Sequence, residues 1–218
     1  MISILLQTKG AVRITREHVH ALVYSSLPDH YHELGSGRTY ENQDPVRNHS
    51  ILVYSGNYQK NDLVNIEVRG IGTIEEDFQL PDKVQLGGVE MKVLGVVNHD
   101  SAAPLTMETV KPILIRLGLN RPEAQALLRP GQKTAYWVYE DDPKGWTREI
   151  ENRLFTRGKL KNRPVITVAK AETVRDRHKG NLVKGTMATL TFNDPYWAKL
   201  AYQLGIGERC TYGFGVLD

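Results

Sequence analysis

The chain has 218 residues and a formal net charge of +3 at pH 7; 40% of its residues are hydrophobic and 24% are charged. This composition excludes an intrinsically disordered chain, because the apolar fraction is that of folded domains and there is no low-complexity tract. The length fits one large domain or two of about 100 residues each. The apolar start, residues 1–6, is too short for a signal peptide or a membrane span, so we expect a cytoplasmic protein without membrane contact.

Cysteine usage and charge distribution narrow the function further. The single cysteine, Cys210, allows no internal disulfide, and the scattered histidines show no zinc-binding spacing. We therefore predict a reducing compartment, with no metal and no cofactor. Residues 145–218 hold 13 Lys and Arg against 7 Asp and Glu, a net of +6, whereas residues 1–144 have a net of −3. Such an excess fits either a nucleic-acid partner or a solvated basic surface.

The first half of the sequence predicts several strands and one clear helix. The helix begins at Thr15 as N-cap and ends at Pro28, with Val19, Leu22 and Val23 at helical spacing. A polar and irregular stretch follows over 29–48, and no strong second helix is predicted before residue 98. The predicted strands cover residues 2–6, 50–55, 63–69 and 84–97, the last with a turn at Gly87-Gly88.

After a linker-like stretch at 98–104, strands and helices alternate again. The clearest element is the last helix, which has Asp194 as N-cap, Pro195 in its first turn and Gly205 at its end. The strand before it alternates, with Ala188, Leu190 and Phe192 on one face. The predicted strands are 109–117, 134–139, 164–175, 182–192 and 212–217, and the helices are 122–128, 146–157 and 194–204.

From Thr109 onward we interpret the order as strand, helix, strand, strand, helix, strand, which is that of a ferredoxin-like fold. The first half gives a looser version of the same order. The sequence therefore predicts an α+β protein of two tandem ferredoxin-like (RRM-like) domains, residues 1–100 and 105–218. Each domain is an antiparallel sheet covered by helices on one face.

Four glycines lie in the segment Gly-Ile-Gly-Glu-Arg-Cys-Thr-Tyr-Gly-Phe-Gly, residues 205–215, which we call the glycine segment. Glycines let a backbone reverse tightly, or let its N–H groups approach a phosphate. The segment follows a helix and does not open one, which excludes a dinucleotide fingerprint or a P-loop. Arg209 adds a guanidinium that can pair with phosphate, and Tyr212 and Phe214 either stack on bases or pack into the core.

The order of strand, helix ending Leu204-Gly-Ile-Gly207, polar run and Gly213-Phe-Gly215 resembles the C-terminal signature of a known family. These are the CRISPR repeat-RNA endoribonucleases, the sixth Cas family of the RAMP superfamily, whose non-cleaving relatives carry similar glycine loops. The resemblance continues upstream. Its pieces there are Leu22-Val-Tyr24, Tyr31-His32-Glu33-Leu-Gly35, Arg38, Arg47 and Ile51-Leu-Val-Tyr54-Ser55. Where the family usually has a lysine before that last strand, this chain has Arg47, Asn48, His49 and Ser50.

The resemblance implies a metal-independent reaction in which an RNA 2′-hydroxyl attacks the adjacent phosphate, leaving a 2′,3′-cyclic phosphate and a 5′-hydroxyl. Histidine suits the proton transfers, and an arginine fork suits the phosphate oxygens. His32 matches the family motif and is the first catalytic candidate, with His49 as a possible second histidine. Tyr24 either orients the phosphate or ribose or packs its ring into the core. Arg38 and Arg47 are the candidate cations.

The predicted RNA-binding residues come from three places, and follow the phosphate backbone by charge. They are Gly205, Gly207, Arg209, Gly213 and Gly215 in the glycine segment, Arg157, Lys159 and Lys161 around the end of a helix, and Arg175, Arg177 and Lys179 in residues 175–179. Residues 175–179, which include His178, are predicted to form a basic hairpin tip or a solvated turn. We call them the hairpin tip.

The leading hypothesis is a CRISPR RNA-processing endoribonuclease that also binds the processed guide RNA, with repeat RNA and subunits of a CRISPR effector complex as partners. The protein is then a monomer or a homodimer. Two alternatives stay open: a RAMP subunit that holds guide RNA without cutting, and a ferredoxin-like pair used for protein assembly without an RNA role.

Overall fold

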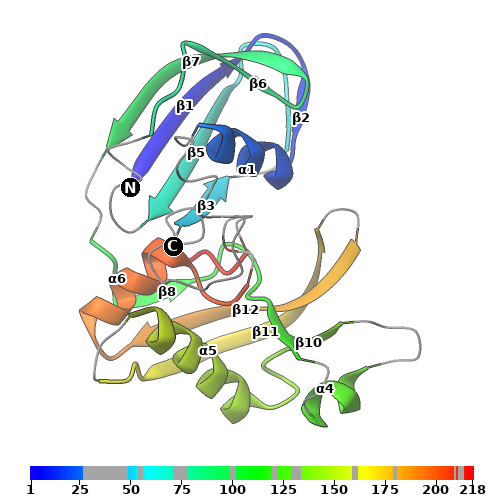
Figure 1. Cartoon of the computed structure of the whole chain (residues 1–218), viewed down its shortest axis with the longest axis vertical. Helices are drawn as coiled ribbons and strands as arrows, with labels where there is room; N and C mark the ends of the chain where they lie inside the picture. The colour runs from blue at the N-terminus through cyan, green and yellow to red at the C-terminus, as the bar shows by residue number, and fades with distance from the viewer. Residues whose placement is uncertain are drawn as a thin grey trace. The chain divides into compact units, whose positions relative to one another are not determined.

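The computed structural model describes residues 1–26, 49–53, 56–70, 78–98, 102–118, 122–128, 134–158, 162–178, 181–208, 210 and 214–218. The chain forms two compact units, and the boundary along the chain falls between Ala102 and Ala103. The second unit comprises Ala103–Cys210 and Phe214–Asp218. Figure 1 gives the element labels used below.

The first unit is built on a five-stranded antiparallel sheet in the order β3-β5-β1-β7-β6. The central strand, β1, pairs with β5 on one side and with β7 on the other. The strands of this sheet are β1 (Ile2–Thr8), β3 (His49–Val53), β5 (Leu63–Gly70), β6 (Lys83–Leu86) and β7 (Val89–Asn98). Two short strands, β2 (Val12–Ile14) and β4 (Gly56–Tyr58), form a separate pair.

One helix, α1 (Arg16–Ser25), lies across a face of this sheet (Figure 1). It begins where the sequence predicts, because the Thr15 side chain accepts a hydrogen bond from the backbone N–H of His18, and His18 Nδ1 accepts one from the N–H of Thr15. This is a capping box with histidine in the position usually held by Glu or Gln. Val19 and Val23 then pack on the alternate residues of β1 and β5 in a common core.

The second unit contains the sheet β11-β12-β8 and the pair β10-β9. Its strands are β8 (Thr106–Glu108), β9 (Ile115–Leu117), β10 (Ala135–Trp137), β11 (Ile166–His178) and β12 (Asn181–Phe192). Its helices are α4 (Pro122–Leu127), α5 (Pro143–Gly158) and α6 (Pro195–Leu204).

The chain end completes this sheet. The N–H of Glu108 donates to the carbonyl of Asp218 at 2.8 Å, and the N–H of Asp218 donates back at 2.8 Å. The sheet order is therefore β11, β12, β8, then residues 216–218. With α5 between β8 and β11, and α6 between β12 and the chain end, this is the ferredoxin-like arrangement. In the first unit, the order β3-β5-β1-β7 repeats it, with β6 added at the edge.

Helices α5 and α6 pack on one face of β11 and β12. Trp146, Ile150 and Leu154 of α5 are buried, as are Trp197 and Leu200 of α6. The two helices meet where Gly158, the last residue of α5, faces the Trp197 ring. The predicted alternation of β12 is confirmed, because Ala188, Leu190 and Phe192 are buried while their neighbours are partly exposed.

Two predicted strands differ from the structure. Of the predicted strand over 109–117, only Ile115–Leu117 form a strand, β9; β8 lies before it, and the segment between the two contains Pro112, which has no N–H to donate to a sheet. The predicted strand over 212–217 has only its last residues in the described part of the chain. There Thr109 and Leu217 form an isolated bridge. Strands β2 and β4 were not predicted, and each is only three residues long.

The tight approach of α5 to α6 yields a first prediction. A Cβ on Gly158 would overlap the Trp197 ring, so Gly158→Ala should lower the free energy of unfolding by about 2 kcal/mol through overpacking. Urea unfolding followed by circular dichroism measures this change. Gly95→Ala is the control, since a Cβ there meets nothing within 4 Å. Equal stability of the two variants would contradict the packing described here.

Candidate functional site

Of the five predicted catalytic residues, Tyr24 and His49 lie in the described part of the chain. His32, Arg38 and Arg47 lie outside the described residues. Tyr24 is in the last turn of α1 and packs, partly buried, against the core of the first unit. As its spacing predicts, its ring shares a face with His20, and the two rings stack at 8° with centroids 6.2 Å apart. The catalytic role of Tyr24 stays a prediction.

His49 opens β3, an edge strand of the first sheet. Its backbone pairs with Gly70 of β5, which fixes where the strand begins. The helix that carries Tyr24 is in contact with β3. The structure thus brings the elements that carry two predicted catalytic residues against each other within one unit.

The predicted RNA-binding residues divide in the same way. Lys159, Lys161, Lys179, Arg209 and Gly213 lie outside the described residues. The described ones are Gly205, Gly207, Gly215, Arg157, Arg175 and Arg177, all in the second unit. They come from three places: the two other arginines from the hairpin tip, the glycines from the glycine segment, and Arg157 from α5.

At the end of the long hairpin of β11 and β12, Arg175 and Arg177 are exposed. Arg175 pairs in register with Lys184, and Arg177 with Leu182, so these four side chains share one face of the hairpin. Strand β8 pairs with β12 only over residues 189–191, so the hairpin runs on well past it (Figure 1). Lys184 is partly neutralised by Asp141, 3.6 Å away. The hairpin therefore presents a basic, elongated surface.

His178 does not belong to that surface. The prediction that residues 175–179 form a solvated or RNA-gripping tip is wrong for this residue, because only 3% of it is exposed. Its ring meets Phe214 edge to face, with centroids 5.7 Å apart. Phe214 is itself fully buried, so of its two predicted roles, packing into the core is the one confirmed.

The described glycines of the glycine segment are buried and approach other backbone closely. Gly205, Gly207 and Gly215 have φ values of 68°, 91° and 61°, which L side chains rarely adopt. A Cβ on Gly207 would lie 2.6 Å from the carbonyl oxygen of Leu114, and one on Gly215 would overlap the carbonyl of Ile206. Glycine is therefore required at these positions by contacts inside the protein.

The backbone N–H groups of this segment donate to internal carbonyls. Gly205 donates to Ala201, as expected of a helix C-cap. Ile206 donates to Gly215 at 2.8 Å, and Glu208 donates to Leu114 at 2.9 Å. The N–H of Gly215 donates to the carbonyl of Pro112 at 3.1 Å. These four donors are thus engaged within the protein and do not point to a ligand.

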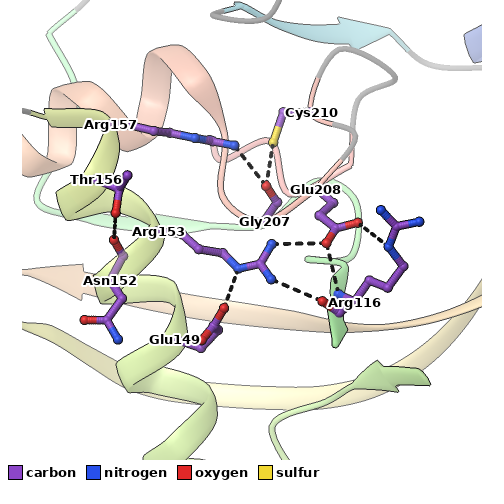
Figure 2. A network of polar contacts seen from close by, with 9 residues as sticks. All are labelled: Arg116, Glu149, Asn152, Arg153, Thr156, Arg157, Gly207, Glu208 and Cys210. Carbon is purple, nitrogen blue, oxygen red and sulfur yellow. Dashed lines mark hydrogen bonds and ion pairs between the residues drawn. The ribbon is translucent and has the colours of Figure 1, made fainter. Parts of the chain in front are cut away.

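Arg157 holds the same segment from α5. Its two terminal nitrogens donate to the carbonyls of Gly205 and Gly207 at 3.2 and 3.1 Å, and Figure 2 shows the contact with Gly207. The guanidinium also lies at the C-terminal end of α6, where a cation is favoured by the helix dipole. The structure therefore gives Arg157 two partners inside the protein, and its predicted RNA contact stays a prediction.

Glu208 anchors the segment on the other side. Its Oε1 accepts from Arg153 Nη1 at 3.2 Å and from the backbone N–H of Arg116 at 3.3 Å, and its Oε2 forms an ion pair with Arg116 Nε at 3.4 Å (Figure 2). Arg153 also donates to Glu149 on its own helix and to the carbonyl of Arg116. No local pattern in the sequence connects Glu208 with Arg116, because 92 residues separate the two partners.

The open face of the second sheet is polar. The side chains around its shallow depression include Glu108, Lys170, Glu172 and Thr189. An RRM stacks bases on aromatic residues of this face. Because the described residues around the depression include no aromatic side chain, base stacking there is not supported.

Comparison with solved structures identifies the class of this fold. The Cas6-related protein of Pyrococcus furiosus aligns with a TM-score of 0.68 at 15% identity, covering 100% of this chain and 96% of that one. A CRISPR-associated protein Cas6 gives 0.66 at 17% identity, covering 100% and 97%. A RAMP protein described as binding different RNA substrates gives 0.62 at 15% identity, covering 100% and 98%. No curated protein matches the sequence.

These likenesses confirm the predicted fold class: an α+β protein with two ferredoxin-like units in tandem, of the kind found in CRISPR-associated RAMP proteins. Comparison of the sequence with family models identifies the family. Residues 99–218 match the family model of the C-terminal part of CRISPR-associated protein Cas6. This match covers more than half of the chain. The chain therefore belongs to the Cas6 family.

Within the described residues, none of the helices has the length and apolar composition of a membrane span.

The thiol beside Arg157 provides a second prediction. Burial raises the pKa of Cys210, because the thiolate loses its hydration. Since the folded state holds this proton more tightly, its contribution to stability is present at neutral pH and is lost as the pH rises above about 8.5, the ordinary thiol pKa. At pH 8 the native protein should react with a disulfide reagent about a hundredfold more slowly than the urea-unfolded chain. Equal rates would show that the thiol is accessible.

Proposed function

We propose that this chain is a metal-independent endoribonuclease that cleaves CRISPR precursor repeat RNA and keeps the processed guide RNA bound. Membership of the Cas6 family, over residues 99–218, is the observation that carries the proposal. The His32 motif in the first half supports cleavage in addition to binding. Subunits of a CRISPR effector complex are the protein partners in this proposal, and the protein acts as a monomer or a homodimer.

The proposed reaction uses side chains alone. A histidine, His32 or His49, takes the proton of the RNA 2′-hydroxyl as its oxygen attacks the phosphorus. The bond from phosphorus to the 5′-oxygen breaks, and an acid protonates that oxygen, which leaves a 2′,3′-cyclic phosphate and a 5′-hydroxyl. Arg38 or Arg47 stabilises the negative charge that grows on the phosphorane oxygens. Tyr24, fixed in α1 against the core, orients the phosphate or the ribose.

RNA binding is assigned to the basic hairpin. Arg175 and Arg177 are exposed on one face of β11, and Lys184 lies opposite in register. Such a row follows a phosphate backbone, and the length of the hairpin carries it past the rest of the sheet. Lys159, Lys161, Lys179 and Arg209 extend the basic surface in the proposal.

The alternative is a RAMP subunit that binds guide RNA without cutting it. The observation that favours it is that the described residues of the glycine segment, which carries the family signature, are engaged in packing and include no candidate catalytic group. Cleavage then depends entirely on the first unit.

Cleavage separates these two functions. The purified protein, incubated with the repeat RNA of its own genome in EDTA, should release a fragment ending in a 2′,3′-cyclic phosphate. His32→Ala should slow this step by about a hundredfold or more, and His49→Ala is tested in parallel and in the double variant. Product analysis by gel and mass spectrometry measures the rate and the ends. Tight binding without product would support the non-cleaving subunit, and so would cleavage unchanged in the double variant.

The hairpin is tested by salt dependence. Exchanging Arg175 and Arg177 together for Ala should weaken binding and reduce the slope of log K against log salt by about 1.4, since each lost phosphate contact on a single strand accounts for about 0.7. Lys199→Ala, an exposed lysine on α6, removes a charge elsewhere and should leave the slope unchanged. An unchanged slope in the double variant would show that the hairpin arginines do not contact RNA phosphates.

A further inference from the structure

The glycine segment is held by its surroundings on two sides. On one side, Arg157 joins the carbonyls of Gly205 and Gly207; on the other, Glu208 joins Arg153 and Arg116. Between these two anchors the backbone donates to Leu114 and lies against it. One short stretch of chain is therefore tied to α5, to β9 and to the end of α6 at once (Figure 2).

A phosphate-binding loop has the opposite character. It presents several N–H groups that have no partner in the protein, arranged around a concavity. Here the N–H groups of Ile206, Glu208 and Gly215 already have carbonyl acceptors at 2.8 to 3.1 Å. A phosphate at these atoms would have to displace backbone hydrogen bonds of the fold.

Arg157 is suited to this internal role by its shape. Its planar fork reaches two carbonyls that are two residues apart, which a lysine ammonium cannot reproduce with the same geometry. The guanidinium also lies near the buried Cys210 thiol. Arg157 is partly buried, and two of its terminal nitrogens already donate to carbonyls, so fewer of its N–H groups are left for a phosphate.

We propose that Arg157 and Glu208 are positioning residues: they clamp residues 205–208 of the glycine segment in one conformation, and affinity for RNA depends on that conformation although neither side chain contacts RNA. The part that concerns RNA rests on the proposed function. The clamp itself does not, because it is defined by contacts within the second unit.

The clamp is tested without RNA by the reactivity of Cys210. Arg157→Lys keeps the charge but loses the fork, so the thiol should react with a disulfide reagent at least about tenfold faster than in the wild type, under conditions where circular dichroism shows both proteins folded. Glu208→Gln keeps the shape but loses the ion pairs, and should also accelerate labelling. The matched control is Arg148→Ala, an exposed arginine on the same helix, which should leave the rate unchanged. Unchanged rates in both clamp variants would overturn the proposal.

The role in RNA binding is tested with fluorescein-labelled repeat RNA from the protein's own genome, by anisotropy over a series of salt concentrations. For a positioning residue, Arg157→Lys and Arg157→Ala should both weaken binding about tenfold or more with the salt slope unchanged. A direct phosphate contact predicts a different pattern: Arg157→Lys binds nearly as the wild type does, and Arg157→Ala loses about 0.7 from the slope. That second pattern would overturn the positioning role.

The two proposals fail in distinguishable ways. If the wild-type protein does not bind the repeat RNA, the proposed function fails, while the labelling of Cys210 still decides whether the clamp exists. If the RNA binds and is cleaved but the clamp variants match the wild type in both experiments, the function stands and the clamp is overturned.

Discussion

The second unit depends on one close approach of backbone to backbone, that of the glycine segment to residues 112–114 and to the chain end. The carbonyls of Pro112 and Leu114 accept from Gly215 and Glu208, and Gly207 lies where a Cβ would meet Leu114. This approach joins the end of α6 to the segment between β8 and β9. It also returns the chain so that residues 216–218 pair with β8, which completes the ferredoxin-like sheet. Removing it would leave the sheet without its fourth strand.

The same contacts determine which positively charged side chains of the second unit are engaged within the protein. The sequence places 13 Lys and Arg in residues 145–218, and by number alone each is a candidate for binding phosphate. Arg153 is, however, held between Glu149 and Glu208, and Arg157 between two carbonyls. Arginines held in this way contribute more to the stability of the fold than to the binding of an external anion. In the proposed function, the exposed arginines of the β11 and β12 hairpin are the ones that contact RNA.

Local sequence patterns predicted the features that are determined by interactions between nearby residues. The Thr15 and Asp194 caps, the alternation of β12 and the helix end at Gly205 all depend on neighbours within a few residues, and each is confirmed. Contacts between segments that are far apart in the sequence could not be predicted. Nothing near residue 157 indicates that its side chain ends on the carbonyls of Gly205 and Gly207, 48 and 50 residues away. The burial of His178 against Phe214 was missed for the same reason, because a run of charged neighbours suggested solvent.

This difference also explains why the two halves resemble the family unequally. At Gly207 and Gly215 a side chain would collide with backbone, so a protein that closes its second unit in this way has few alternatives to glycine, and the pattern is recognisable from sequence. A catalytic histidine needs only to present a ring nitrogen to its substrate, which different backbone paths achieve. A signature set by backbone contact therefore identifies the fold of the family. It carries little information on cleavage, which in the proposed function belongs to side chains of the first unit.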